Sequence, residues 1–163
     1  MKKKRKLIAA VSVILVLFAG LYIYLFVGAK NHNKPEIVAG DEGTDALVVY
    51  FTRSGVIDTD GVEAVSSASL NQTDDGLMGN TQLTANAVCE LTGADMFEIQ
   101  TDRYYRKPFM GTAATAWLEE KLDLRPELAG MPENLDKYNV IYVGYPIWWF
   151  NAPMAVGTFL ESY

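Results

Sequence analysis

The longest apolar run of the chain is also its first. It extends from Leu7 to Val27 without a charged residue. As a helix it would measure about 31 Å at 1.5 Å per residue, enough to cross the hydrocarbon core of a bilayer. Five basic residues, Lys2 to Lys6, precede it directly. Because positive flanks stay in the cytoplasm, the pattern predicts a cytoplasmic basic tail and transmembrane signal-anchor over residues 1–29, with the remaining chain outside the cytoplasm.

A cleaved signal peptide is the alternative interpretation of this run, and it would leave the protein secreted. The apolar core of a signal peptide usually has about 7 to 15 residues, fewer than this run. Val27-Gly28-Ala29 is nevertheless a tolerable cleavage site with small residues. We favour the uncleaved anchor in the cell membrane. A lipoprotein anchor is excluded at this position because no cysteine follows the run.

Beyond the anchor, residues 30–44 form a polar linker, and short apolar runs then alternate with amphipathic segments. The first run, at 47–51, is continuous and rich in β-branched and aromatic residues, which is typical of a strand buried on both faces. Further strands are expected at 96–100 and 140–143, and helices at 81–91, at 112–124 and from 151 onward. This alternation predicts an α/β fold, a doubly wound parallel sheet with helices on both faces.

Helical periodicity also predicts which side chains of the first two helices of this domain face the sheet. They are Leu83, Ala87, Val88 and Leu91 in the first helix, and Ala113, Ala116, Trp117 and Leu124 in the second. Gly93 is expected to end the first helix as a C-terminal cap. Residues 56–78 are rich in glycine, aspartate, serine and threonine, and we interpret them as an inserted loop with room for a short hairpin.

Charge is distributed very unevenly along the chain. All 20 acidic residues lie after position 35, and the segment from residue 31 onward has eight basic residues, a net charge of −12. This charge argues against nucleic acid as a partner, because phosphates would be repelled. It is compatible with steering of a basic partner, and equally with solubility alone.

Cysteine and histidine each occur once, as Cys89 and His32. A single cysteine excludes a disulfide framework and a cysteine metal site within the chain. A single histidine in a polar stretch next to the anchor argues against a Ser-His-Asp or Cys-His site and against a zinc site with several histidines. Most hydrolase chemistry is thereby disfavoured.

Candidate phosphate-binding residues occur where the first strand ends and the first helix begins. Hydroxyl groups are available from Thr52, Ser54 and Thr81, and Gly55 and Gly79 permit close approach of the backbone. Backbone N–H groups and the positive end of the helix dipole would add to such an anion site. The alternative is an ordinary strand-to-helix turn with a capping threonine. A nucleoside-triphosphate loop is excluded because no Gly-Lys-Ser/Thr follows.

Two adjacent indoles, Trp148 and Trp149, follow the last predicted strand. Alternation places them on opposite faces, so one could pack inward while the other stacks on a flat aromatic ligand. Packing of both in the core is the alternative. Pro146 and Pro153 would make this loop stiff. Since ligands of open α/β sheets bind at the carboxyl ends of the strands, this loop and the Thr52 loop would meet at one edge.

Several segments together resemble the flavodoxin-like family. They are Val-Val-Tyr-Phe-Thr-Arg-Ser-Gly55, Gly-Asn-Thr81, Thr-Gly-Ala-Asp-Met-Phe-Glu-Ile99, Gly-Tyr-Pro-Ile-Trp-Trp149 and Ala-Pro-Met154. The closest similarity is to the short-chain group that usually has Ser-Arg-Ser-Gly-Asn-Thr in its phosphate loop. The resemblance covers residues 45–163, with the phosphate motif divided by the insertion at 56–78. Three of the family's usual five strands are present, so the chain is expected to be part of a longer protein.

The resemblance implies a noncovalently bound FMN. By analogy, the phosphate would be held by Thr52, Arg53, Ser54, Gly55, Gly79, Asn80 and Thr81. The isoalloxazine ring would lie against Pro146, Ile147, Trp148 and Trp149. The implied function is that of a membrane-anchored flavoprotein, which transfers electrons or reduces small acceptors outside the cytoplasm. The alternative is a flavin-free, membrane-anchored interaction module that retains the fold.

Overall fold

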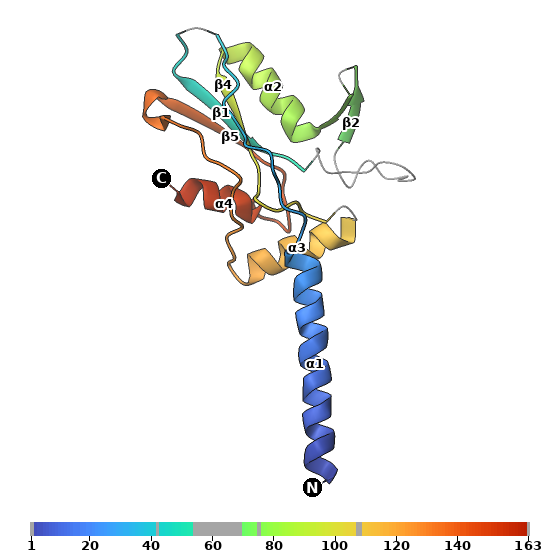
Figure 1. Ribbon diagram of the computed structural model, residues 1–163. Coiled ribbons are helices and arrows are strands. Elements are labelled where there is room, and N and C mark those ends of the chain that lie inside the picture. Colours follow the sequence, from blue (N-terminus) through green and yellow to red (C-terminus); the bar gives the residue numbers. More distant parts are fainter. Residues whose placement is uncertain (1, 42, 54–69, 75, 107–108, 163) are drawn as a thin grey trace.

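The computed structural model describes residues 2–41, 43–53, 70–74, 76–106 and 109–162 (Figure 1). Helix α1 (Lys2–Phe26) projects from the remainder of the protein as a single straight rod. It is long and apolar enough to cross a membrane by length and composition, and its apolar stretch is not buried by other parts of the structure. This agrees with the N-terminal helix expected from the sequence.

The centre of the domain is a parallel sheet of three strands in the order β4-β1-β5. Strand β1 (Ala46–Phe51) lies in the middle, with β4 (Asp95–Ile99) and β5 (Val140–Gly144) on either side. All six residues of β1 are buried, because neighbours cover both its edges and helices cover both its faces. The order β4-β1-β5 corresponds to strands 2-1-3 of a flavodoxin-like sheet, which confirms the predicted fold class.

Alternate residues of β1 pack against helices on opposite faces of the sheet. Val48 and Tyr50 belong to a cluster with Ala85 of α2 (Asn80–Thr92). Leu47, Val49 and Phe51 belong to the larger cluster formed with α4 (Met154–Glu161). Figure 1 shows α2 and α4 on either side of the strands. The apolar run of β1 therefore forms two cores, as expected for a doubly wound sheet.

The predicted inner face of the first of these helices, α2, is wrong in part. Leu91 is 86% exposed and Ala87 is also exposed. Val88 packs against the sheet as predicted, together with Ala85 and Cys89, and the three follow the i, i+3, i+4 spacing of a helix face. Small side chains at this contact allow the helix to lie close to the strands. Gly93 ends α2 in the left-handed conformation, with φ 66° and its N–H donated to the Cys89 carbonyl, as predicted.

Helix α3 (Phe109–Lys121) begins and ends three residues before the predicted 112–124. Of the residues expected to face inward, Ala116 is buried, whereas Trp117 is 42% exposed and Leu124 lies beyond the helix and is exposed. The buried stripe consists mainly of small or polar residues, namely Gly111, Thr112, Thr115, Ala116 and Glu119. Apolar periodicity missed this stripe because its polar groups are hydrogen-bonded inside the protein, as Thr112 is to the Arg106 carbonyl.

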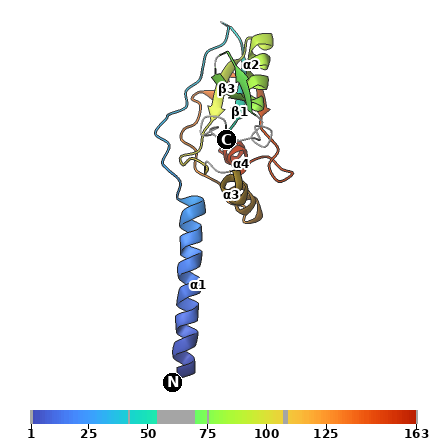
Figure 2. The ribbon, with the colours of Figure 1, turned by 90° about the vertical axis from the view of Figure 1, so that its right-hand side faces the viewer.

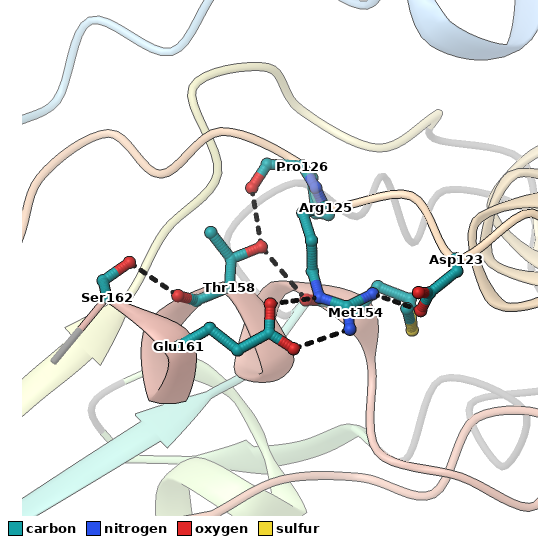
Figure 3. A network of polar contacts seen from close by, with 7 residues as sticks. All are labelled: Asp123, Arg125, Pro126, Met154, Thr158, Glu161 and Ser162. Atoms are coloured by element: carbon teal, nitrogen blue, oxygen red, sulfur yellow. Dashed lines mark hydrogen bonds and ion pairs between the residues drawn. The ribbon is translucent and has the colours of Figure 1, made fainter.

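An arginine fixes the position of α4 against the segment that follows α3 (Figure 3). Arg125 donates two hydrogen bonds to Glu161 near the end of α4, at 2.8 and 2.6 Å, and one to Asp123 at 2.6 Å. The hydroxyl of Thr158 donates to the Pro126 carbonyl at 2.9 Å. These bonds hold the end of α4 against the chain between α3 and β5.

A short antiparallel hairpin lies at the end of the predicted insertion. It consists of β2 (Leu70–Thr73) and β3 (Gly76–Gly79), and β3 leads directly into α2. The first part of the insertion, together with Ser54 and Gly55, lies outside the described residues.

The stretch after α1 runs along the free edge of β4. Val38 and Met96 exchange two backbone hydrogen bonds of 2.8 Å. The buried Asp95 carboxylate accepts hydrogen bonds from the Gly40 N–H at 2.8 Å and the Tyr138 hydroxyl at 2.5 Å. The expected linker therefore covers a strand edge that would otherwise be open to pairing with another chain.

Candidate functional site

The carboxyl ends of the three parallel strands form one edge of the sheet. The loops that follow β1, β4 and β5 begin at Thr52, Gln100 and Tyr145. In open parallel sheets, ligands bind in the crevice outside these ends. The residues expected from the sequence to hold a ligand follow β1 and β5 or start α2, so their positions at this edge decide whether they can act together.

Thr52 and Arg53 continue from the end of β1 and are both half-buried. Together with Tyr104 and Tyr105 they line a cavity of about 280 Å³. The Arg53 guanidinium donates a hydrogen bond of 2.8 Å to the Arg106 carbonyl. Burial lowers the pKa of Arg53, but a guanidinium remains charged in proteins. Arg53 therefore brings a positive charge to the carboxyl edge.

The N-terminus of α2 is available for an anion. Its N-cap is Gly79 in an extended conformation, and no side chain among the described residues caps it. The first turn contains no acidic residue, so nothing in that turn opposes a negative charge. A Cβ atom placed on Gly144 would lie 3.6 Å from the Thr81 methyl group. The start of α2 is therefore beside the carboxyl end of β5.

Trp148 and Trp149 have different environments, as their alternation predicted. Trp148 packs edge-on against Phe51 and Tyr105, with ring centroids 5.3 and 5.2 Å apart. Trp149 is 49% exposed, and its indole N–H donates to the Ala113 carbonyl at 2.8 Å. Trp148 thus supports the loop from inside, whereas Trp149 offers an indole surface to a ligand.

Trp149 and Phe150 form the tip of a tight turn with an unusual backbone. Trp148 and Asn151 exchange two backbone hydrogen bonds of 2.9 Å, and the two residues between them have φ angles of 48° and 67°. Left-handed conformations are disfavoured for bulky side chains, and a two-residue turn of this type usually contains Asn-Gly. Such strain is concentrated at functional sites, which supports this loop as part of a binding site.

The structure brings most of the expected ligand-binding residues to one edge. Thr52 adjoins Phe51, which contacts Trp148, and Thr81 lies beside Gly144, which precedes the aromatic loop. Asn80 begins α2 at the same place. Ser54 and Gly55 lie outside the described residues. In the aromatic loop, Pro146 is half-buried and Ile147 is exposed.

Three residues of this edge are not among those predicted to bind the cofactor: Phe150, Tyr105 and Glu119. The Tyr105 hydroxyl donates a hydrogen bond of 2.9 Å to the Glu119 carboxylate, and burial raises the pKa of Glu119 to about 7. Both line a cavity of about 430 Å³ between the end of α1 and the domain. The adjacent aromatic residues Tyr104 and Tyr105 are a sequence feature from which Tyr105 could have been proposed as a site residue. No feature of the sequence pattern sets Glu119 apart from the other glutamates.

Comparison with known families and structures identifies relatives of the same fold. The family described as Flavodoxin matches residues 73–163, more than half of the chain. A crystal structure of a candidate flavoprotein from Bacteroides uniformis has a TM-score of 0.53 and 27% sequence identity, covering 74% of this chain and 65% of that one. Another, from Bacteroides eggerthii, has a TM-score of 0.52 and 23% identity, covering 74% and 64%.

The chain therefore spans slightly less than two thirds of the length of each of these solved proteins. No curated protein matches it. The family match begins within the β2–β3 hairpin and includes α2, β4, α3, β5 and α4. Because that match covers more than half of the chain, and the sheet has the strand order that the fold requires, the chain belongs to the flavodoxin family.

Proposed function

We propose that this protein is a membrane-anchored flavoprotein that binds FMN noncovalently at the carboxyl edge of its sheet. It would transfer electrons outside the cytoplasm, either as a carrier or as a reductase of small acceptors such as quinones. The observation that carries the proposal is the position of the N-terminus of α2, which no described side chain caps, beside the carboxyl end of β5, where the loop that presents Trp149 begins. This combination suits a ligand with both an anionic group and a flat aromatic ring.

The phosphate of FMN fits the start of α2. Backbone N–H groups of the first turn and the positive end of the helix dipole favour an anion there. Asn80 and the hydroxyls of Thr52, Ser54 and Thr81 would donate further hydrogen bonds, and Gly55 and Gly79 would allow close approach. Arg53 supplies a positive charge at the same edge, where charge-assisted hydrogen bonds are stronger than neutral ones.

The isoalloxazine ring fits the aromatic loop. Trp149 offers a half-exposed indole for stacking, and the side chain of Ile147, two residues earlier, is also exposed. Pro146 would restrict the loop, and Trp148 holds it from inside against Phe51. When bound, FMN would supply the one- and two-electron chemistry, and the protein would orient the ring and exclude water from it.

Titration of the full chain in detergent micelles with FMN and with riboflavin tests this assignment. Riboflavin has the same ring without the phosphate, so the proposal expects FMN to bind at least tenfold more tightly, with its fluorescence quenched. Equal affinities would show that no phosphate site exists. No binding of either ligand by protein with a native circular dichroism spectrum would favour the flavin-free interaction module.

A further inference from the structure

The outward side of α3 is apolar along nearly its whole length. At 100° per residue, one side of the helix carries Met110, Ala113, Ala114, Trp117 and Lys121, and we call this the outer face of α3. Met110 is 72% exposed and Trp117 is 42% exposed. The face is uncharged until Lys121 in the last turn. Exposed apolar surface of this kind on a folded domain usually marks an interaction site.

The position of α3 indicates what this face meets. In Figures 1 and 2, α3 lies beside the C-terminal end of α1 and at the same height as its last turns. The Arg106 guanidinium lies 4.8 Å from the ring centroid of Tyr24 and donates to the carbonyl groups of Ile23 and Val27 at 3.3 Å. The N-terminal apolar run ends at Val27, directly after α1. If α1 spans a bilayer, α3 must therefore lie at the surface of that bilayer.

The junction between α1 and the domain is hydrogen-bonded rather than free. Arg103 donates to the Gly28 carbonyl at 3.1 Å, and the Tyr104 N–H donates to the Ala29 carbonyl at 3.0 Å. The backbone N–H of the buried Asn31 donates to the Asp102 carbonyl at 2.7 Å. These bonds restrict rotation of the domain about α1, so the domain keeps one orientation relative to that helix.

The local charge agrees with a lipid surface. Residues 31–163 have a net charge of −12, yet the stretch from 103 to 118 contains three basic residues and no acidic residue. Its aromatic residues are Tyr104, Tyr105, Phe109 and Trp117. Segments that lie in the membrane interface combine basic residues with tryptophan, tyrosine and phenylalanine. This stretch has that composition within an otherwise acidic domain.

We propose that the outer face of α3 lies on the surface of the bilayer that contains α1, and that this contact turns the carboxyl edge of the sheet toward the membrane. The indole of Trp149 is bonded to the Ala113 carbonyl of α3, and the neighbouring Phe150 is almost fully exposed. The aromatic loop is thereby held close to the same surface. The proposal rests on the anchoring proposed above. It means that the redox partner reaches the flavin from the membrane, as a lipid-soluble or membrane-bound molecule.

Environment-sensitive labels on the full chain test this contact in protein-free phosphatidylcholine vesicles. With Cys89 replaced by serine, a nitrobenzoxadiazole label is attached through Met110→Cys, Trp117→Cys, Leu15→Cys or Leu91→Cys. Leu15 lies within α1, and Leu91 is an exposed leucine at the end of α2 farthest from α1 (Figure 1). Lipids that carry a nitroxide quencher then report proximity to the bilayer, independently of flavin binding.

The proposal expects labels at positions 15, 110 and 117 to be quenched at least threefold more than the label at 91. Quenching at 15 with labels at 110 and 117 matching the one at 91 would overturn the proposal while leaving α1 in the membrane. An unquenched label at 15 would refute the anchor, and the surface contact with it. Protection of positions 110 and 117 only in native membranes, and not in protein-free vesicles, would assign the face to a protein partner and overturn the lipid contact.

Discussion

Glu119 is a buried carboxyl group whose ionisation should contribute to the pH dependence of stability. Burial raises its pKa to about 7, against an ordinary value of 4.5. Between these values the folded protein retains a proton that the unfolded chain releases. The stability that this proton contributes is complete below pH 4.5, decreases as pH rises, and is lost above pH 7.

We therefore expect Glu119→Gln to remove this decrease and to raise the free energy of unfolding at pH 8 by up to about 3 kcal/mol. Glutamine can still accept the hydrogen bond from Tyr105. Urea unfolding of the full chain in micelles between pH 4.5 and 8 measures the effect, with the exposed Glu127→Gln as a control. A slope unchanged by Glu119→Gln would contradict the assignment.

Arg53 should distinguish the phosphate site from the ring site. Replacing it with alanine removes a charged donor from the carboxyl edge, so we expect FMN affinity to fall about tenfold and riboflavin affinity to remain unchanged. Arg53→Lys keeps the positive charge, so its FMN affinity should fall less than that of Arg53→Ala. Fluorescence titration with both ligands gives the answer. An equal loss for the two ligands would mean that Arg53 acts through its bond to the Arg106 carbonyl rather than on a phosphate.

At the residue scale, the sequence identified candidate binding residues better than it identified the surroundings of each side chain in the fold. The contrast between Trp148 and Trp149 followed from strand alternation and is present in the structure. The roles of Glu119 and Phe150 could not be predicted. The role of Glu119 depends on its hydrogen bond with Tyr105, fourteen residues away in the chain. The role of Phe150 depends on a left-handed backbone conformation, which an aromatic residue does not predict.

At the scale of elements, we expect the turn from Trp148 to Asn151 to be strained, and a glycine in place of Phe150 to relieve that strain. Phe150 has φ 67° and a side chain that is 99% exposed, so its removal loses little packing. A bulky residue in this conformation costs about 1 to 2 kcal/mol, a strain that glycine avoids. Phe150→Gly should therefore be about 1 kcal/mol more stable than Phe150→Ala, which keeps the strain.

Thermal unfolding of the two variants, followed by circular dichroism without flavin, measures this difference. The same glycine should weaken FMN binding if the strained turn positions Trp149 for the ring, because a relaxed turn no longer fixes the indole. Equal unfolding temperatures for the glycine and alanine variants would show that the turn is not strained at Phe150.

Strands and helices differed in how well their details could be predicted. The strand β1 was recognisable because a run buried on both faces is uniformly apolar. The helix faces were partly wrong because α3 buries threonines and a glutamate, and α2 contacts the sheet through Ala85 rather than Leu91. Apolar periodicity marks the buried face only where burial is achieved by apolar side chains.

For the whole molecule, the fold class was predicted from the order of strands and helices and from the family motifs. The alternation of strands and helices led to a doubly wound sheet, and the family match and strand order confirm it. The arrangement of the domain relative to α1 was not predictable, because it depends on bonds such as those from Arg103 to the Gly28 carbonyl and from Arg106 to the Ile23 carbonyl. That arrangement joins the two proposals, since a bilayer spanned by α1 would lie at the same end of the domain as the candidate flavin site.

The central claim is that the carboxyl edge binds FMN with its ring against Trp149. The most direct measurement is the quenching of FMN fluorescence by the full chain in micelles, compared between the unaltered protein, Trp149→Ala and the control Trp117→Ala. We expect stoichiometric quenching by the unaltered protein and by Trp117→Ala, and at least about a fivefold weaker affinity for Trp149→Ala, because a stacked indole contributes about 1 kcal/mol or more. Equal quenching by Trp149→Ala, or none by the folded unaltered protein, would contradict the claim.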